Sequence, residues 1–434
     1  MKKYFVTASL LSFCVTFNGL ATESNLNEPQ LMLDNVSDVY YRKNSYSSFA
    51  IQRDGAIWKI PDMGSPINTG LIITPDLIQE LQPFAVESFA ALLKNGELII
   101  YHEGQKVTPW ATPPKDIIQI ETSYNSGLYA LRSNGTMLHW NPYNGTDGTI
   151  CSSKIKDISK ILLSAKGVSA LAINSKGEIL TTGYICSDDN AIYKYPLTSY
   201  GISDKPLEIV YNNSYEFTIL DTNRTAYTFL VDYNNQPLIS QQKDIRALGH
   251  SQIWGTGDGI APVYITNKGE FISPYHSTNI LLEDAKLADS IKVTNTIVSW
   301  RNTDSTIGFW DNENIISKEG RERLLALKNI KQIHTTVDIF ASLSTDGKVN
   351  CWGNSSFSNA ECSLENHEIE NVKKLTTSMW GIGILRNDGT LLYISNEPQK
   401  ISLIAAREII EIYGTMMNIL AKDIDGSLYK INSY

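Results

Sequence analysis

The sequence predicts an all-β fold, a β-propeller whose blades are about forty residues long. Three observations support this prediction. One short phrase recurs along the chain: two apolar residues, two polar residues, a turn dipeptide ending in glycine, and then alternating apolar residues. The copies lie about forty residues apart, and helical periodicity is nearly absent between them. A repeat of this length built only from strands is typical of propeller blades.

Composition excludes several other classes. The chain has 434 residues with a formal net charge of −9, and 42% of its residues are hydrophobic while only 19% are charged. That balance excludes a disordered chain. The acidic charge also argues against a nucleic-acid partner, because phosphates are held by basic patches. The 22 tyrosines and 8 tryptophans suit strands and wet binding faces, since each ring has an apolar body and a polar tip.

Residues 1–21 have the pattern of a secretory signal peptide. Met1-Lys2-Lys3 is cationic, residues 4–17 are mostly apolar, and Gly19-Leu20-Ala21 supplies small residues for cleavage. A lipoprotein signal that uses Cys14 is less favoured, because a bulky residue precedes it. The apolar stretch is too short for a stable membrane span, and no later run reaches eighteen apolar residues. We therefore expect an exported bacterial protein, secreted or periplasmic, without stable membrane insertion after cleavage.

Ten copies of the repeat fill residues 36–434, which we interpret as one propeller domain of seven or more blades and up to ten repeat units. Two copies are degenerate and turn at Asn223-Arg224 and near Asp304-Ser305. The other eight turn on a glycine, which accepts the positive φ of a tight hairpin. The turn glycines are Gly55, Gly96, Gly135, Gly177, Gly269, Gly347, Gly389 and Gly426.

Each unit is expected to contain three or four strands. The second residue after the turn is apolar in every copy, and an aromatic residue recurs five positions after it. A further short apolar strand precedes most hairpins, as at 117–120 and 330–333. The best helix candidate, 401–412, is interpreted as part loop and part strand. The recurrent aromatics, expected in the blade core, are Tyr101, Trp140, Phe229, Trp310 and Trp352.

Closure of the ring is expected at the chain's two ends. The last copy ends directly after its hairpin and has no segment for an outer strand. An unpaired edge invites pairing with another chain. Leu31-Met32-Leu33 lies before the first copy, in the N-terminal segment 22–35. We expect this segment to supply the outer strand of the C-terminal blade.

The unit resembles the repeat of the regulator of chromosome condensation family. That pattern runs as a glycine, a histidine, Ala-Leu, Asp-Gly and then Trp-Gly, and LSTDGKVNCWGNSSFSNAEC, from Leu343 to Cys362, resembles its later part. The short blade is similar to secreted bacterial members such as the propeller β-lactamase inhibitory protein. The resemblance covers about Val36 to Tyr434 and implies a propeller with an aromatic loop face. Ten units exceed the seven usual blades, and after a hairpin turn Trp-Gly survives only at Trp352-Gly353. The family glycine is replaced by Asn44, Ala85, Tyr124, Lys166, Thr336 and Ser378.

Four cysteines follow the signal segment, and an even number in an exported protein permits disulfides with three possible connectivities. We favour a Cys351–Cys362 pair, with Cys151–Cys186 as the second pair. A zinc site is the rival interpretation, but C-x-x-C is absent and no histidine has ligand spacing to these cysteines. No metal or cofactor is expected.

The sequence offers no catalytic constellation, and we expect no enzymatic activity. The six histidines form no metal-ligand pair, and the serine-nucleophile and phosphate-loop motifs are absent. The glycine-rich stretch 255–259 is interpreted as a loop, and His139 as an ordinary strand residue. Asp423 and Asp425, like Asp188-Asp189, lack calcium-loop spacing, and Asp425 is a turn residue.

A protein-binding face is the favoured site. The loop before each hairpin should emerge on one face of a propeller, and large side chains recur in it, as expected for binding anchors. The favoured function is an exported, monomeric interaction module with a protein partner, such as an inhibitor, a virulence factor or a surface-recognition factor. One alternative is a propeller lyase or glycoside hydrolase with a central-channel site, and another is a host-delivered nucleotide-exchange factor. The candidate anchors are Tyr46, Tyr124, Tyr215, Trp254, Trp380 and Met416.

Overall fold

The structure is a computed structural model, and it describes most of the chain after the signal segment. The described residues are 29–41, 47–84, 87–123, 127–143, 148–151, 157–163, 170–176, 179–182, 192–195, 208–211, 216–230, 239–252, 260–273, 280–293, 297–311, 316, 318–336, 339–353, 369–378, 381–395, 401–405, 408–415 and 417–432.

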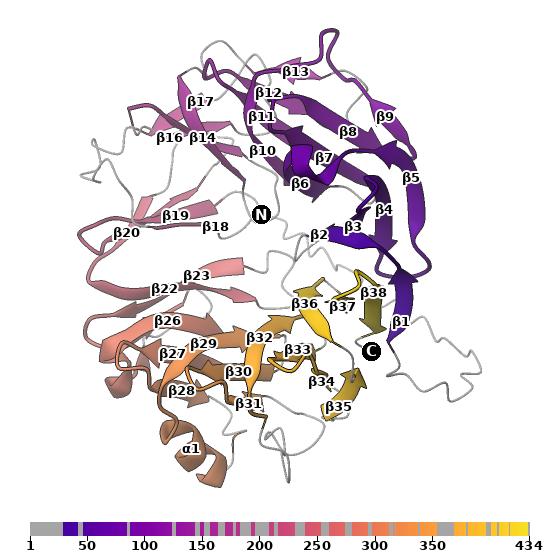
Figure 1. The fold of residues 1–434 in the computed structure, drawn as a ribbon. Helices are drawn as coiled ribbons and strands as arrows, with labels where there is room; N and C mark the ends of the chain where they lie inside the picture. Colours follow the sequence, from indigo (N-terminus) through magenta and orange to yellow (C-terminus); the bar gives the residue numbers. More distant parts are fainter. Residues whose placement is uncertain are drawn as a thin grey trace, which may run out of the picture.

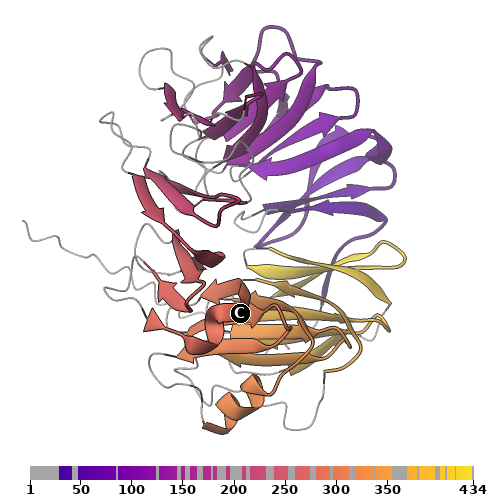
Figure 2. The ribbon, with the colours of Figure 1, turned by 90° about the vertical axis from the view of Figure 1, so that its left-hand side faces the viewer.

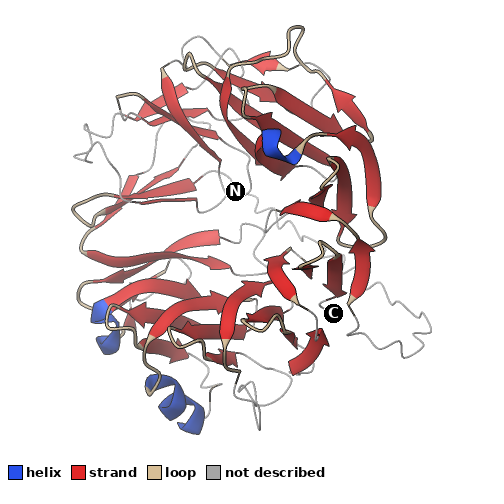
Figure 3. Cartoon of the chain, viewed as in Figure 1, coloured by secondary structure: helices blue, strands red, loops and turns tan. Residues whose placement is uncertain are grey.

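The described residues form a β-propeller, as the repeat predicted. Small antiparallel sheets follow one another around a common centre, and the α-helix lies at the periphery (Figures 1 and 3). One seven-stranded sheet contains two blades, which a single parallel bridge between Ser251 and Val293 joins. The described strands therefore make ten blades, which equals the number of repeat units in the sequence. We number the blades along the chain and call the first strand of each blade its inner strand.

The strands of each blade follow chain order. Blades 1 to 3 contain β2 (Val36–Tyr40), β3 (Ser47–Gln52), β4 (Ala56–Pro61) and β5 (Ile67–Ile72); β6 (Ile78–Phe84), β7 (Ser88–Leu93), β8 (Leu98–His102) and β9 (Gln105–Val107); and β10 (Ile117–Ser123), β11 (Gly127–Arg132), β12 (Met137–Trp140) and β13 (Thr149–Ile150). Blades 4 to 6 contain β14 (Ile158–Leu163), β15 (Ala170–Asn174), β16 (Ile179–Thr182) and β17 (Ile192–Tyr195); β18 (Glu208–Tyr211), β19 (Glu216–Leu220), β20 (Ala226–Leu230) and β21 (Ile239–Gln242); and β22 (Ile245–Gln252), β23 (Ile260–Thr266), β24 (Glu270–Ile272) and β25 (Ile280–Leu281).

Blades 7 and 8 contain three described strands each, and the last blade includes the N-terminal strand. Blades 7 and 8 contain β26 (Ala288–Val293), β27 (Ile297–Asn302) and β28 (Ile307–Asp311); and β29 (Ile330–Thr335), β30 (Ile339–Ser344) and β31 (Val349–Gly353). Blades 9 and 10 contain β32 (Val372–Thr377), β33 (Gly381–Arg386), β34 (Leu391–Ser395) and β35 (Ile401–Ala405); and β36 (Ile409–Gly414), β37 (Asn418–Asp423), β38 (Leu428–Asn432) and β1 (Gln30–Leu33). Short 3₁₀ turns occur at Pro75–Leu77 and Glu283–Leu287.

The turn glycines have two physical roles. The seven that are described all have positive φ, and in the two degenerate turns Arg224 and Ser305 adopt positive φ in their place. In seven of the nine described turns, the carbonyl of the turn residue also accepts a hydrogen bond from the first residue of the next inner strand, whereas Gly55 O and Gly269 O accept one from Ile73 and Leu282, which precede that strand. Ile330 N–H, for example, donates to Ser305 O at 2.8 Å, and Val372 N–H donates to Gly347 O at 2.9 Å. The turn therefore links neighbouring blades. Gly177 lies outside the described residues.

Most inner strands also share an irregularity in their pairing with the second strand of the blade. In nine of the ten described inner strands the pairing register shifts directly after the first residue, as in a β-bulge. A bulge bends the strand and increases its twist. An Asn or Asp with positive φ precedes five of these strands, and side chains of these types tolerate that conformation better than most. These residues are Asn35, Asp157, Asp244, Asn329 and Asn371.

Most of the predicted core positions are buried. Ile57, Met137 and Leu428, each two positions after a turn, have no exposed surface. Among the recurrent aromatics, Tyr101, Trp140 and Trp352 are buried, and Trp310 packs partly buried against the cluster of blades 6 and 7. The predicted strand interpretation of 401–412 is confirmed, because β35 and β36 cover most of that segment.

One helix was not predicted. The α-helix α1 (Lys318–Leu325) follows β28, where other blades have a fourth strand. Its Leu324 is buried in the cluster that includes Ile297, Phe340 and Trp352. The segment KEGRERLL is rich in residues with high helix propensity but carries few apolar residues, so amphipathic periodicity is weak. The helix covers the outer side of blade 7 and contributes one buried leucine, Leu324, because Leu325 is 51% exposed.

The ring closes between blades 10 and 1. Strand β1, which contains the expected Leu31-Met32-Leu33, pairs antiparallel with β38. Met32 and Leu33 are buried with residues of β2, β3, β37 and β38. Figures 1 and 2 both show the yellow last blade beside the indigo first blade. The first and last segments of the described chain thus complete one sheet.

A buried polar cluster also holds this junction. Asp62, which follows β4, is 7% exposed. Its Oδ1 accepts hydrogen bonds from Thr415 Oγ1 at 3.0 Å and Asn418 Nδ2 at 3.2 Å. Lys430 Nζ donates to Gly64 O at 3.1 Å. Burial raises the pKa of Asp62, although these hydrogen bonds and the Lys430 charge oppose the shift. Burial lowers the pKa of Lys430.

We expect Asp62→Ala to lower the free energy of unfolding by about 2 kcal/mol, because Thr415 and Asn418 each lose a buried acceptor. Asp62→Asn keeps an acceptor oxygen and should cost less. Since the folded-state pKa of Asp62 is raised, its stabilising contribution is present below the unfolded pKa and is lost as pH rises through the folded pKa. Urea unfolding from about pH 4 to about pH 7 should show wild type losing stability relative to Asp62→Asn. A pH-independent difference would contradict this assignment.

Candidate binding face

The six candidate anchors all lie outside the described residues, so their side-chain positions stay a prediction. Each falls in the segment between the inner strand and the second strand of a blade; Trp380, for example, lies between β32 and β33. The described inner strands run in the same direction around the ring, so their last residues, which precede these segments, lie at one end of the propeller. We call this end the loop face. The glycine turns lie at the opposite end, which we call the turn face.

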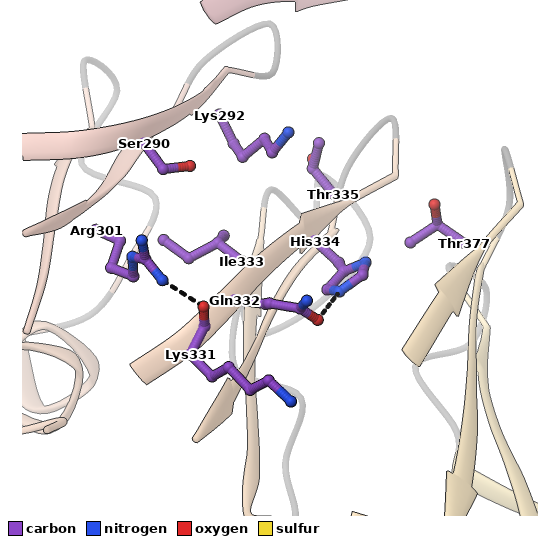
Figure 4. Close-up of a pocket in the computed structure, with 9 residues that line it drawn as sticks. All are labelled: Ser290, Lys292, Arg301, Lys331, Gln332, Ile333, His334, Thr335 and Thr377. Atoms are coloured by element: carbon purple, nitrogen blue, oxygen red, sulfur yellow. Dashed lines mark hydrogen bonds between the residues drawn. The ribbon is translucent and has the colours of Figure 1, made fainter. Parts of the chain in front are cut away.

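A cleft of about 470 Å³ runs along the inner strands of blades 7 to 9. Its lining comes mainly from the inner strands β26 and β29, with Arg301 from β27 and Thr377 from the end of β32. Figure 4 shows these side chains around the opening, with His334 and Thr335 between the strands of blades 7 and 9. We call it the cationic cleft. It is lined by Ser290, Lys292, Arg301, Lys331, Gln332, Ile333, His334, Thr335 and Thr377.

Hydrogen bonds fix part of the cleft wall. The Arg301 guanidinium binds the carboxylate of Asp289 through two contacts of 2.9 and 2.8 Å. A third guanidinium nitrogen donates to the carbonyl of Lys331, which links blade 7 to blade 8. His334 Nε2 lies 3.2 Å from Gln332 Oε1 (Figure 4). A bidentate arginine pair of this kind holds its planar head group in one orientation.

Charges are segregated among the inner strands. The three neighbouring strands β26, β29 and β32 carry Lys292, Lys331, Lys373 and Lys374, and their only acidic residue is Asp289. The next four around the ring, β36, β2, β6 and β10, carry no lysine or arginine. Their charged residues are Glu411, Asp38, Glu80 and Glu121. The centre of the propeller therefore has a basic arc and an acidic arc.

Tyr413 lies at the border of the two arcs. Its hydroxyl donates to Glu411 Oε2 at 2.5 Å, and Lys374 Nζ lies 5.6 Å from the centre of its ring. Burial, reinforced by the hydrogen bond and charge of Glu411, raises the pKa of Tyr413 well above its usual range. The phenol thus stays protonated, and its hydrogen bond fixes the Glu411 carboxylate next to the acidic arc.

A second cavity, of about 700 Å³, is lined by blade 3 and by the segment that joins blade 2 to it. Trp110, Pro113 and Pro114 form much of its wall, together with the ion pair in which Arg132 Nε lies 2.9 Å from Asp116 Oδ1. This cavity is more apolar than the cationic cleft and lies away from the segregated charges.

The other residues that the sequence raised have structural roles or fall outside the described part. His139 is buried, and its ring lies 4.4 Å from that of Tyr129. Asp423 accepts hydrogen bonds from Ser427 N–H and the Tyr429 hydroxyl, as a turn residue does. Within the described ranges, His, Cys, Asp and Glu nowhere form a metal-binding group of three or more. The stretches 188–189 and 255–259 lie outside those ranges.

The cysteines are partly described. Cys151 and Cys351 are each bonded to another cysteine, and both are close to blade strands. Their expected partners, Cys186 and Cys362, lie outside the described residues. The pairing therefore stays a prediction.

Comparison with known proteins supplies no family. No protein-family model matches the chain, and no curated protein matches its sequence. Similar solved structures include the computationally designed Ika8 protein (13% identity, TM-score 0.36, 93% of this chain and 97% of that one) and BamB from Moraxella catarrhalis (13%, 0.37, 81% and 92%). The C-terminal WD40 domain of Sif2 is also similar (9%, 0.39, 93% and 98%). Likeness this distant transfers no function, and the resemblance to the chromosome condensation family stays a prediction.

Helices of the described chain are too short or too polar to cross a membrane.

Proposed function

We propose that this protein is an exported, monomeric interaction module that binds a protein partner through the loop face. One observation carries the proposal: Tyr46, Trp254, Trp380 and the three other candidate anchors all occur in segments that join an inner strand to the second strand of its blade. Six blades thus contribute a large side chain to the same class of loop. Tyr and Trp dominate the binding energy of many protein interfaces.

The propeller scaffold supports this function physically. Most neighbouring blades are tied together through turn hydrogen bonds and shared apolar clusters, so their loops have a rigid base. Presenting the loops from a rigid base reduces the entropy lost on binding. An inhibitor, a virulence factor or a surface-recognition factor would each use such a face in this way. The signal-like segment 1–21 supports export, which makes secreted or periplasmic proteins the candidate partners.

The test is capture of partners by the mature protein from secreted and periplasmic fractions, followed by titration of the partner obtained. We expect the triple variant Tyr46→Ala/Trp254→Ala/Trp380→Ala to bind that partner at least about 100-fold more weakly, since hot-spot residues each contribute about 2 kcal/mol or more. A matched control is Leu287→Ala/Ile424→Ala, which removes two exposed apolar side chains away from the loop face. Equal binding by the triple variant and wild type would refute the proposed face.

A further inference from the structure

The cationic cleft has the features of a site for carboxylates. Of the nine described residues that line it, three are Lys or Arg and none is Asp or Glu. Lys292 and His334 are half-buried, so their side chains are less hydrated than those at an open surface. Ser290, Thr335 and Thr377 add hydroxyl groups that can donate hydrogen bonds to carboxylate oxygens.

This positive charge stands out against the rest of the molecule. The chain as a whole carries a formal charge of −9, yet three adjacent inner strands carry four lysines. Asp289, their one acidic residue, is held by Arg301, which keeps it at the wall of the cleft. A cluster of one sign in a recessed site attracts the opposite charge more strongly than scattered surface charges do.

The surroundings restrict the kind of anion. A long polyanion, such as a nucleic acid or an acidic polysaccharide, would extend from the cleft toward the acidic arc of Asp38, Glu80 and Glu411 and be repelled there. A volume of about 470 Å³ admits a few side chains. A short acidic stretch of a polypeptide is small enough for the cleft and carries its charges in one place, so it avoids the acidic arc.

One end of the cleft reaches the loop face, which supplies a second argument, whereas Lys331, the second residue of β29, lies toward the turn face. Lys292, Thr335 and Thr377 lie at or next to the ends of their inner strands, where the chain enters the loops. Trp380 follows Thr377 by three residues. A protein held on the loop face by aromatic anchors would therefore have its acidic segment within reach of the cleft.

We propose that the cationic cleft binds the carboxylate side chains of an acidic segment of the protein partner, with Lys292 and Lys331 as the binding cations and Ser290, Thr335 and Thr377 as hydroxyl donors. This inference rests on the proposed interaction function and deepens it. It predicts a charge-dependent contact separate from the aromatic anchors. The contact selects which partner binds and speeds its association, as complementary charge does at other interfaces.

Fluorescence anisotropy with a labelled, capped hexaglutamate peptide tests the proposal on the whole mature protein. We expect saturable binding that weakens as NaCl rises from about 50 to about 300 mM, because salt screens the attraction. Lys292→Gln/Lys331→Gln should weaken binding at least about tenfold. Lys160→Gln is the matched control, since Lys160 is an exposed lysine of another inner strand, β14, and its loss should change affinity less than about twofold.

Three results would overturn the inference: no binding of hexaglutamate at millimolar concentration, binding unaffected by the double variant, or binding of hexagalacturonate or a six-nucleotide DNA as tight as that of the peptide. Lys331→Glu alone keeps the test valid if the double variant does not fold, because Lys331 is exposed. If hexaglutamate fails while the aromatic triple variant still loses the captured partner, this inference falls and the proposed function stands. If the triple variant keeps the partner, the proposed function falls whatever the peptide does.

Discussion

Replacing Gly426 with alanine is expected to destabilise the propeller by about 3 kcal/mol. Gly426 has φ of +90°, a conformation that costs a residue with a Cβ about 1–2 kcal/mol. The new Cβ would also lie 2.9 Å from Val36 O and 3.1 Å from Val36 N. The backbone must then move, although Val36 N–H donates to Gly426 O at 2.7 Å across the junction of blades 10 and 1. Forcing atoms into a packed site adds about 1–3 kcal/mol.

Gly104→Ala separates the two contributions. Gly104 has a similar φ of +87° in the turn between β8 and β9, but no neighbouring atom lies within 4 Å of the position that its Cβ would take. This variant should lose only about 1 kcal/mol, which is the conformational cost alone. Urea unfolding of both variants and wild type measures the difference. Equal losses would show that contact between blades is not what requires glycine at position 426.

The sequence predicts one of the two roles of the turn glycines, the positive φ of the hairpin turn. A turn dipeptide between alternating apolar residues is a local signal, and it predicted the positive φ found at Gly55 and Gly347. It also predicted where the two degenerate turns lie, and Arg224 and Ser305 adopt positive φ there. The approach of the next inner strand could not be predicted, because it joins residues of different blades. The sequence shows only that the glycine recurs.

The ring order of the blades determines the charge pattern. In the sequence, Lys292, Lys331 and the pair Lys373-Lys374 lie about forty residues apart, and each is typical of a solvated strand face. Only the arrangement of β26, β29 and β32 as neighbours brings them to one side. The sequence did hold one sign of the basic arc: a lysine recurs within two residues of the apolar residues of these inner strands. By contrast, the aromatic anchors could be proposed from sequence, because a large side chain in a recurrent loop is a local pattern.

The helix α1 was missed for a related reason. Its stability comes from Leu324, which packs against a cluster formed by blades 7 and 8. An eight-residue segment is too short to be stable alone in water, so propensity gives little warning of it. Tertiary contact decided the structure of this segment.

Deleting residues 29–34 is expected to produce the largest loss of stability, more than about 4 kcal/mol. Met32 and Leu33 are buried against Val36, Tyr413 and Leu428, and truncating a buried aliphatic side chain costs about 2–5 kcal/mol each. The deletion also removes the backbone pairing of Gln30, Leu31 and Leu33 with β38. The exposed edge of β38 would then be available to other chains, so we expect concentration-dependent association in light scattering.

Two point variants within β1 distinguish lost packing from general damage to the N-terminus. Leu31 is 51% exposed and Leu33 is 8% exposed, although they lie two residues apart in one strand. Leu33→Asp places a charge in the junction core and should approach the effect of the deletion, whereas Leu31→Asp should cost less than about 0.5 kcal/mol, as a surface substitution does. Similar losses from both variants would mean that β1 does not close the ring through its buried face.

Addition of the missing strand in trans gives the decisive measurement. A peptide with the sequence of residues 28–36 should bind the deleted protein, because an open sheet edge accepts an extended segment through main-chain hydrogen bonds. Binding should restore the urea midpoint toward that of wild type and suppress self-association, since the same edge mediates both. The same peptide carrying the Leu33→Asp change should do neither, because its buried face is spoiled while its backbone is intact. If the altered peptide rescued as well as the native one, backbone pairing alone would close the propeller, and the buried side chains of β1 would contribute little to closure.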